Sequence, residues 1–399
     1  MSIDTSSGPV VSGAAMRAAV TESLASIAAN ADRAEQERRV PDENIAALRE
    51  AGLFRALQLS RYGGTPMGAE EYTPALVDIA GACASTAWVA GLLAQHSHLI
   101  GLMSAELQDE VWADDPTALA SSSVAAINGC EEVPGGGVRL NGSWGWSSGC
   151  DHASWAILGF RRADPVLGGM VIPHFAVVPK ADYRIHDDWF VAALRGTGSK
   201  TLVVDDVYVP EHRIESFLAL GTGTTKGFGL HGGIFHAAFV NWFSLGFSAV
   251  SLGIARRFIE VYREKVSSRV RAYTGAKVAD SAAAAMRIAE SHHQTTAVYH
   301  TLHADWSAMT ARALAGELPT DDEAVHWRSN QAYATKQSIE AVDRLWSASG
   351  GSAFFDSNEM QRLWRDSKMT GSHAYSDYDI AAQKHGRHLL GLPPDMTLF

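Results

Sequence analysis

The feature that most constrains the fold is that the chain changes its residue pattern twice. Up to about residue 115, apolar residues recur every three or four positions, as they do in amphipathic helices. After Asp114-Asp115-Pro116 the pattern becomes short β-branched and aromatic runs separated by glycine and proline, and beyond about residue 230 helical spacing returns. We therefore expect three domains, at residues 1–115, 116–230 and 231–399.

Short runs typical of strands mark the middle region, which predicts a compact all-β unit, either a barrel or a sandwich. The clearest strands are expected at Val138–Leu140, Trp155–Phe160, Phe175–Val178 and Thr201–Val209. The last region holds helical patterns longer than those of most globular helices, which favours a bundle. These patterns span Asn241–Ser267, Asp280–Ala315 and Asp321–Ala348. The chain is thus expected to be an α+β protein.

Charge and cysteine content exclude several classes of protein. The formal net charge of -11 argues against a nucleic-acid surface and leaves no polybasic patch for a membrane. The most apolar stretch, Trp88–Met103, is too short to span a bilayer. Cys83, Cys130 and Cys150 are isolated, and the first nine residues lack the pattern of a signal peptide, so we expect a cytoplasmic protein.

The segment Asn141–His152, with the sequence NGSWGWSSGCDH, has an unusual composition for a connection between strands. Glycine lets the backbone approach a flat ligand closely, tryptophan offers a large rigid surface, and serine offers a small donor and acceptor. The segment is therefore expected to be a loop that lies along an aromatic cofactor. The alternative is a hairpin loop with a buried tryptophan.

Three common motif classes fit this sequence poorly. Gly145–Gly149 matches the G-x-S-x-G elbow of hydrolases, but a strand follows it instead of the required helix. Neither a P-loop nor a complete dinucleotide fingerprint is present. His96 and His98 point to different faces of a helix, and His300 and His303 share a face without an acidic partner, so no metal site is expected.

Two glycine-containing segments remain ambiguous on their residues alone. Arg269–Gly275 ends a long helix with two arginines, which indicates either a surface helix end or a phosphate clamp. Gly350-Gly351-Ser352 follows another helix and is either a cap or a turn that accommodates phosphate. Gly196–Lys200 is a turn before a strand, and on its residues alone it is compatible with a plain hairpin turn.

Taken together, these segments resemble the acyl-CoA dehydrogenase fold. Leu194–Leu202 continuing to Asp206–Pro210 resembles its β-domain signature, and Trp146-Ser147-Ser148 resembles its flavin-contacting motif. Arg271–Gly275 and Arg365-Asp366 also match. The resemblance implies an N-terminal helical domain, a central β-barrel or sandwich and a C-terminal four-helix bundle.

Within that fold the chain is similar over nearly its whole length to the oxygenase components of two-component flavin-dependent monooxygenases. The segments that carry this resemblance are Arg38–Asn44, Ala120–Ser123, Gly145–His152, Gly246–Gly253, Arg269–Gly275 and His373–Asp379. The resemblance implies a homotetramer and a separate reductase that supplies reduced FMN by diffusion, with FADH2 as the alternative cofactor. Oxygen would add at flavin C4a to give a hydroperoxide, whose distal oxygen passes to the carbon ortho to a phenol hydroxyl.

The same resemblance assigns roles to individual residues. Ser148 would donate to or accept from flavin N5, Trp88 and Trp146 would pack at the flavin ring, and His373 would lie near it and stabilise its anionic reduced form. His96 and Ser122 would hold the phenolic oxygen, with His96 as general base and Ser122 also near the flavin. The pocket walls and the ribityl phosphate site are expected from Phe243, Tyr375, Arg269, Tyr273, Gly351 and Ser352, the last four across subunits.

Two departures limit what the resemblance implies. Where many acyl-CoA dehydrogenases carry a glutamate base, this chain has Ser372–Tyr375, which argues against a dehydrogenase. Val240 stands where a related enzyme has an arginine for a substrate carboxylate, and a buried carboxylate without a partner is costly. We therefore expect a phenol without an acetate arm, or one whose acid is bound elsewhere. The alternatives are an acyl-CoA dehydrogenase-like flavoenzyme, a monooxygenase of a non-phenolic aromatic such as an indole, or a flavin-binding protein without catalysis.

Overall fold

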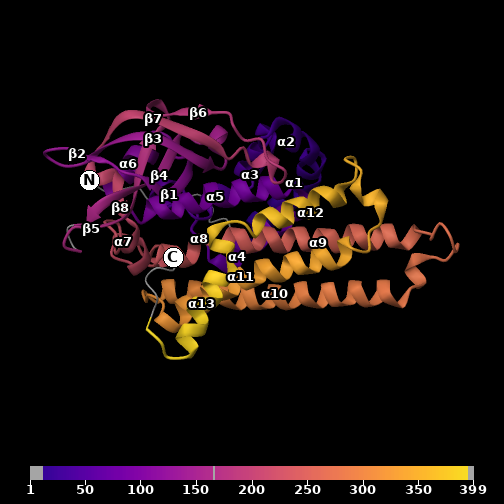
Figure 1. Ribbon diagram of the computed structural model, residues 1–399. Coiled ribbons are helices and arrows are strands. Elements are labelled where there is room, and N and C mark those ends of the chain that lie inside the picture. Colours follow the sequence, from indigo (N-terminus) through magenta and orange to yellow (C-terminus); the bar gives the residue numbers. More distant parts are fainter. Residues whose placement is uncertain (1–11, 165–166, 394–399) are drawn as a thin grey trace.

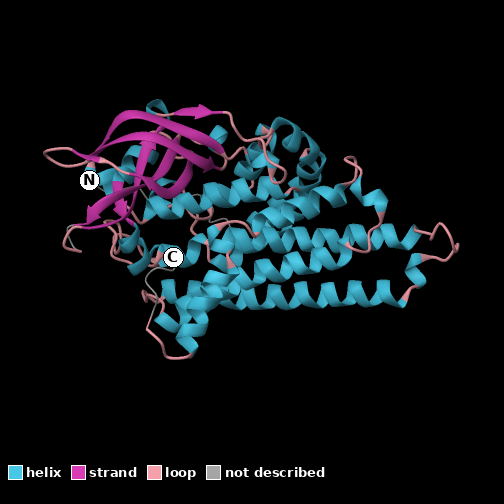
Figure 2. Ribbon diagram, in the orientation of Figure 1, coloured by secondary structure: helices cyan, strands magenta, loops and turns pink. Residues whose placement is uncertain are grey.

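A computed structural model describes residues 12–164 and 167–393 of the chain. The first nine residues, on which the signal-peptide expectation depends, lie outside this range. The strands gather at one end of the molecule, and the long helices α9, α10 and α11 run side by side away from them (Figures 1 and 2). Helix α5 lies between the two parts, in contact with β1 and α9.

The N-terminal helices follow the predicted pattern closely, and their ends have recognisable caps. Ser104 caps α6, because its Oγ accepts a hydrogen bond from the Leu107 N–H at 3.2 Å. The helix expected from Ala14 to Arg39 is divided at Asn30. The helices of this part are α1 (Gly13–Ala29), α2 (Ala31–Glu37), α3 (Asp42–Glu50), α4 (Ala69–Ala82), α5 (Ala84–Gly101) and α6 (Ala105–Trp112).

The C-terminal helices form the predicted bundle. Helix α11 begins with a reciprocal cap between Thr320 and Glu323, and α9 approaches α4 so closely at Gly253 that an added Cβ would lie 2.3 Å from the Val77 carbonyl oxygen. The helices are α7 (Phe217–Thr222), α8 (Phe239–Phe243), α9 (Leu245–Ser268), α10 (Ala282–Leu314), α11 (Asp321–Trp346), α12 (Glu359–Thr370) and α13 (Tyr378–Leu389). Among the residues described, no helix is long and apolar enough to cross a membrane.

The β part consists of two four-stranded sheets, with strand orders β1-β4-β5-β8 and β2-β3-β7-β6. The strands are β1 (Ala120–Asn128), β2 (Glu131–Glu132), β3 (Val138–Ser147), β4 (Trp155–Asp164), β5 (Met170–Pro179), β6 (Arg184–His186), β7 (Lys200–Val209) and β8 (Ile214–Ser216). Strands β1 and β4 pair in parallel, whereas the other pairs are antiparallel. The described strands form a sandwich and close no barrel, so the barrel alternative is wrong.

The segment Asn141–His152 is not a single loop, which corrects the sequence expectation. Strand β3 continues through Ser147 because it pairs with β7, with Ser147 opposite Lys200. Trp144 is buried, and its indole N–H donates to the Gly159 carbonyl at 2.7 Å. Only the end of the segment turns, through a short 3-10 helix at Cys150–His152, so the remaining loop is shorter than expected.

Candidate active site

His96 lies in the middle of α5 with a fully buried side chain. Its Nδ1 is 2.6 Å from the carbonyl oxygen of Ala120. Because a carbonyl oxygen can only accept, Nδ1 carries the proton and Nε2 has a free lone pair. Nε2 has no hydrogen-bond partner among the described residues, and burial lowers the pKa of His96 to about 4. The residue is therefore a neutral base with one unused nitrogen.

His98, two residues further along α5, contacts an entirely different set of groups. Its Nε2 is 2.8 Å from the Ile234 carbonyl oxygen, and the Trp242 ring stacks on it at a centroid distance of 4.9 Å. Phe235 and Phe239 stack against it as well. The two histidines thus point to different faces of the helix, as their spacing predicted.

An aromatic cluster connects His96 with the other residues expected in the pocket. The Phe243 ring lies 6.4 Å from His96 and 4.9 Å from Tyr375, measured between centroids. His373 stacks on Phe247 at 4.0 Å, and its ring meets Trp88 edge-on at 5.7 Å. Side chains from α5, α8, α9 and the short 3-10 helix at Ala374–Ser376 therefore meet in one place.

His373 is a neutral ring at ordinary pH. Its Nδ1 accepts a hydrogen bond from the backbone N–H of Tyr375 at 3.1 Å, so the proton of the neutral ring is on Nε2. Burial and the charge of Arg328 lower the pKa of His373 to about 4. A neutral His373 can donate a hydrogen bond to an anionic flavin but supplies no positive charge, which narrows the role expected from the sequence.

Arg328 of α11 also lies beside this cluster, although its sequence position did not predict this. Its guanidinium carbon lies 5.0 Å from the Tyr375 ring centroid, and one nitrogen donates to the Ala374 carbonyl at 3.2 Å. The Nη1 atom is buried and has no partner among the described residues. Arg328 is one of many charged residues on α11, so its sequence context does not distinguish it.

Ser148 follows directly after β3 and is buried. Its Oγ accepts from the indole N–H of Trp88 at 3.2 Å and lies 2.7 Å from the Ser199 Oγ. Trp146 has a left-handed backbone with φ of 68°. The residue is 67% exposed beside Ser148, and its ring packs edge-on against Trp189. An exposed indole next to a buried hydroxyl is the arrangement expected for a flat ligand.

The serine of the G-x-S-x-G match is Ser147, and its surroundings exclude it as a nucleophile. The side chain is fully buried, and its Oγ donates to the Ser121 Oγ at 3.0 Å. A nucleophilic serine needs an exposed hydroxyl beside a base. The hydrolase interpretation is not supported.

Two further predicted pocket residues are half-buried. Ser122 is half-buried on β1, two residues beyond Ala120, whose carbonyl oxygen contacts His96. Val240 is half-buried on α8 and lies near Gly221.

The residues expected to bind phosphate lie at the opposite end of α9. Arg269 donates to the carbonyl oxygens of Ala348 and Ser349 at 3.1 and 3.0 Å, which places it beside the exposed Gly351 and Ser352. Tyr273 is fully exposed in the loop after the helix. A rise of 1.5 Å per residue puts Arg269 about 30 Å from the aromatic cluster at the start of α9.

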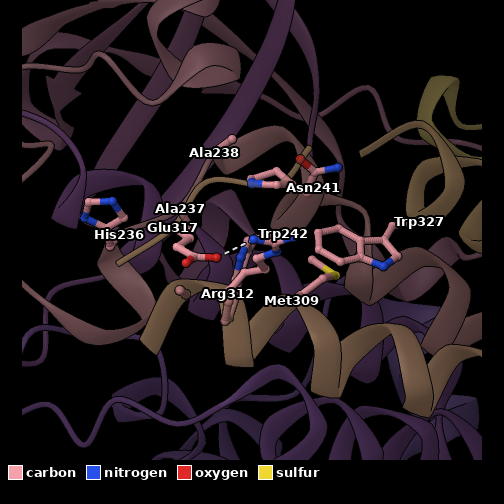
Figure 3. A pocket seen from close by; sticks show the side chains of 11 residues that line it. His236, Ala237, Ala238, Asn241, Trp242, Met309, Arg312, Glu317 and Trp327 are labelled. Atoms are coloured by element: carbon pink, nitrogen blue, oxygen red, sulfur yellow. Dashed lines mark hydrogen bonds and ion pairs between the residues drawn. The ribbon is translucent and has the colours of Figure 1, made fainter. Parts of the chain in front are cut away.

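The cavity in Figure 3 is separate from the cluster. It lies between α8, α10 and α11 and is lined by Asn241, Trp242, Met309 and Trp327, among others. Its volume of about 10 Å³ admits no more than one water molecule. None of the predicted site residues line it. Among the residues described, no group of three or more histidine, cysteine or acidic side chains could hold a metal ion.

The side chains present fit a bound flavin. The exposed Trp146 offers a stacking surface, Ser148 offers a polar atom beside it, and His373 offers an N–H next to Trp88. His96 places its free Nε2 in the same cluster, where an aromatic substrate would meet it. The flavin phosphate would need a second set of residues, namely Arg269, Tyr273, Gly351 and Ser352.

Two family models match the chain. The acyl-CoA dehydrogenase N-terminal domain matches residues 13–112, and the acyl-CoA dehydrogenase C-terminal domain matches residues 245–378. The expected fold class is thereby confirmed, apart from the barrel.

Several proteins of known activity are similar over nearly the whole chain. The oxygenase component of p-hydroxyphenylacetate 3-hydroxylase from Acinetobacter baumannii is 49% identical, over 98% of this chain and 92% of that protein. The structure of the HsaA monooxygenase from M. tuberculosis superposes with a TM-score of 0.90 at 35% identity, over 96% of this chain and all of the other. XiaF from Streptomyces sp., in complex with FADH2 and glycerol, gives a TM-score of 0.88 at 26% identity, over 97% and 98% of the two chains.

Proposed function

We propose that this chain, which belongs to the acyl-CoA dehydrogenase family and within it to the oxygenase components of two-component flavin-dependent monooxygenases, hydroxylates a phenol at the carbon ortho to its hydroxyl. The observation that supports a phenolic substrate is the free Nε2 of His96 inside the aromatic cluster. A neutral histidine with one unused nitrogen can take a phenolic proton, which makes the ring more nucleophilic.

The proposal divides the work between the flavin and the protein. When bound, reduced flavin activates oxygen for transfer to an aromatic ring. His96 Nε2 would accept the phenolic proton, and the Ser122 hydroxyl would orient the phenolic oxygen. Trp88, Phe243 and Tyr375 would exclude water from the ring. Because the pKa of His96 is lowered to about 4, the base stays unprotonated across the neutral pH range.

We further propose that reduced FMN, supplied by a separate reductase in the cytoplasm, is the preferred flavin and that the enzyme is a homotetramer. A single chain cannot hold one flavin with both its ring-binding cluster and Arg269, because a five-carbon ribityl chain is far shorter than the roughly 30 Å between them. Arg269, Tyr273, Gly351 and Ser352 would therefore bind the phosphate of a flavin whose ring lies in a neighbouring subunit.

Val240 and Arg328 bear on whether the phenol carries an acidic substituent. Val240 supplies no charge for a substrate acid, which supports a phenol without an acetate arm. Arg328 supports the other possibility, because its Nη1 is unpaired beside Tyr375. In that case the guanidinium group of Arg328 on α11 would bind an acidic substituent of the substrate.

Incubation with a generic flavin reductase, NADH, isotopically labelled oxygen and either FMN or FAD tests the proposal. The panel should contain p-hydroxyphenylacetate, resorcinol, neutral alkyl phenols and indole. We expect one labelled oxygen atom in a catechol product, with neutral phenols preferred. Label in indole alone would favour the non-phenolic alternative, and desaturation of an acyl-CoA by tightly bound oxidised FAD would favour the dehydrogenase alternative.

A further inference from the structure

Three buried hydroxyl groups form a row that ends at Ser148. The Ser148 and Ser199 Oγ atoms are 2.7 Å apart, and the Ser199 Oγ and Thr197 Oγ1 atoms are also 2.7 Å apart. Thr197 Oγ1 lies 2.9 Å from the carbonyl oxygen of Leu194. All three side chains are at most 6% exposed, so solvent water does not compete for these contacts.

The number of protons determines the direction of every bond in this row. Each close contact between two oxygens needs one proton between them. The Leu194 carbonyl has none, so Thr197 donates to it. Ser199 must then donate to Thr197, and Ser148 must donate to Ser199. The backbone N–H of Thr197 also reaches the Leu194 oxygen at 3.1 Å, but its proton does not lie between the two oxygens of the hydroxyl contact.

The far end of the row is held firmly in place. Leu194 has a left-handed backbone with φ of 46°, and its N–H donates to Asp366 Oδ1 on α12 at 2.6 Å. The Trp189 indole N–H reaches the Leu194 oxygen at 3.3 Å. The acceptor on which the whole row depends is thus fixed between the sandwich and the bundle.

As a consequence, Ser148 has no proton left for a ligand. Its only hydroxyl proton goes to Ser199, and one of its lone pairs accepts from the Trp88 indole N–H at 3.2 Å. The remaining lone pair can accept a hydrogen bond and nothing else. The sequence left open whether this serine donates or accepts.

We propose that the row Thr197–Ser199–Ser148 makes Ser148 an obligatory acceptor for the N5–H of reduced flavin, so that the site selects reduced over oxidised flavin. Oxidised flavin has no proton on N5, and its N5 would face the Ser148 lone pair as a second acceptor. Thr197 and Ser199 act through Ser148 and are positioning residues. The inference rests on the proposed function, because it assumes that the flavin ring lies against Ser148.

Anaerobic binding of FMN in its two redox states tests the proposal without turnover. The dissociation constants of oxidised and reduced FMN are measured for the wild type, Thr197→Val and Ser199→Ala. Either change frees the Ser148 proton to point at the ligand, so the ratio of oxidised to reduced dissociation constants is expected to fall about tenfold, the size of one hydrogen bond. Thr197→Ser keeps the hydroxyl and should keep the wild-type ratio.

Ser147→Ala is the matched control, because it removes a neighbouring buried hydroxyl that bonds to Ser121 and lies outside the row. An unchanged ratio in both Thr197→Val and Ser199→Ala, with wild-type melting curves, overturns the proposal. An equal fall in Ser147→Ala also overturns it, because the effect would then come from packing. A wild-type protein that binds neither form of FMN overturns the proposed function itself.

Discussion

The two ends of helix α9 differ in almost every respect. At its start, Phe247 is buried among His373, Trp88 and Tyr375, so the aromatic cluster forms within one chain. At its far end the chain continues into an exposed loop, where Val270 is 54% exposed and Tyr273 fully exposed. Figure 1 shows this loop projecting beyond the body of the molecule.

This difference indicates which part of the site one chain can supply alone. Buried residues with a satisfied aromatic environment need no partner, whereas an exposed tyrosine and valine beside Arg269 are typical of an interface. In the proposed function, the active site would therefore be assembled from the start of one α9 and the end of another.

The largest effect is expected from His96→Ala, which changes the aromatic cluster beside the start of α9. Loss of a general base lowers the rate of phenol hydroxylation by roughly 10² to 10⁴, while reduced flavin is still oxidised and releases hydrogen peroxide. Product and peroxide are measured in the same assay. His98→Gln is the control on the opposite face of α5 and should retain hydroxylation. Comparable losses in both variants would show that helix packing is responsible.

At the far end, Arg269→Ala should weaken the binding of reduced FMN by roughly 10- to 100-fold, the range for a lost charge-assisted hydrogen bond. Mixing this variant with His96→Ala chains, followed by subunit exchange, provides the sharper test. A hybrid assembly contains sites in which both His96 and Arg269 are intact, so activity should reappear. A mixture that stays as inactive as its components would indicate that one chain supplies both His96 and Arg269 to its site, which contradicts a site shared between subunits.

The neutral histidines of α5 predict a dependence of stability on pH. His96 and His98 take up a proton near pH 6.5 when unfolded but only near pH 4 when folded, because burial lowers each pKa to about 4. The unfolded state therefore binds more protons between these values. The free energy of unfolding should fall by about 1.4 kcal/mol per pH unit for each histidine as the pH drops below about 6.5. Urea titrations of the wild type and His98→Gln measure this slope, which should be smaller in the variant. An identical slope in both proteins would contradict a neutral, buried His98.

The smallest effect is expected from Arg328→Gln. If an acidic substrate is bound from α11, its KM should rise about fivefold, in line with the loss of one partly exposed ionic contact, while KM for a neutral phenol stays unchanged. Steady-state kinetics with a matched acidic and neutral phenol measure the difference. Equal changes for both substrates would show that Arg328 supports Tyr375 rather than a substrate group.

The helical parts of the fold could be predicted from sequence because their signals are local. The Ser104 cap and the apolar spacing of α5 appear directly in the residues. The extension of β3 through Gly142 and Gly145 could not, because glycine has little strand preference and pairing with β7 provides the stabilisation. The break at Ser244 between α8 and α9 was likewise not predicted, because the expected helix Asn241–Ser267 runs through it.

The sequence predicted which residue types gather in the aromatic cluster, but not the directions of their hydrogen bonds. Helical spacing separates His96 from His98, yet only the Ala120 carbonyl shows which nitrogen of His96 is free. The residues of the turn Gly196–Lys200 did not predict its contact with Ser148. Ser199 and Ser148 are 51 positions apart, so only the folded chain brings their hydroxyl groups together. Contacts of this kind depend on tertiary structure, which a residue pattern does not encode. The domain boundaries after residues 115 and 230 and the roles of the site residues stay predictions.

Trp146 illustrates a conflict between the thermal stability of the fold and its proposed activity. A non-glycine residue with φ of 68° is held in a conformation that costs on the order of 1 kcal/mol or more, and its largely exposed ring returns little of this through packing. A glycine at this position would relax the backbone and raise the melting temperature of the ligand-free protein, yet it would remove the surface on which the flavin is expected to lie. Selection of this chain for thermal stability alone would therefore favour loss of the ring on which the flavin is expected to lie.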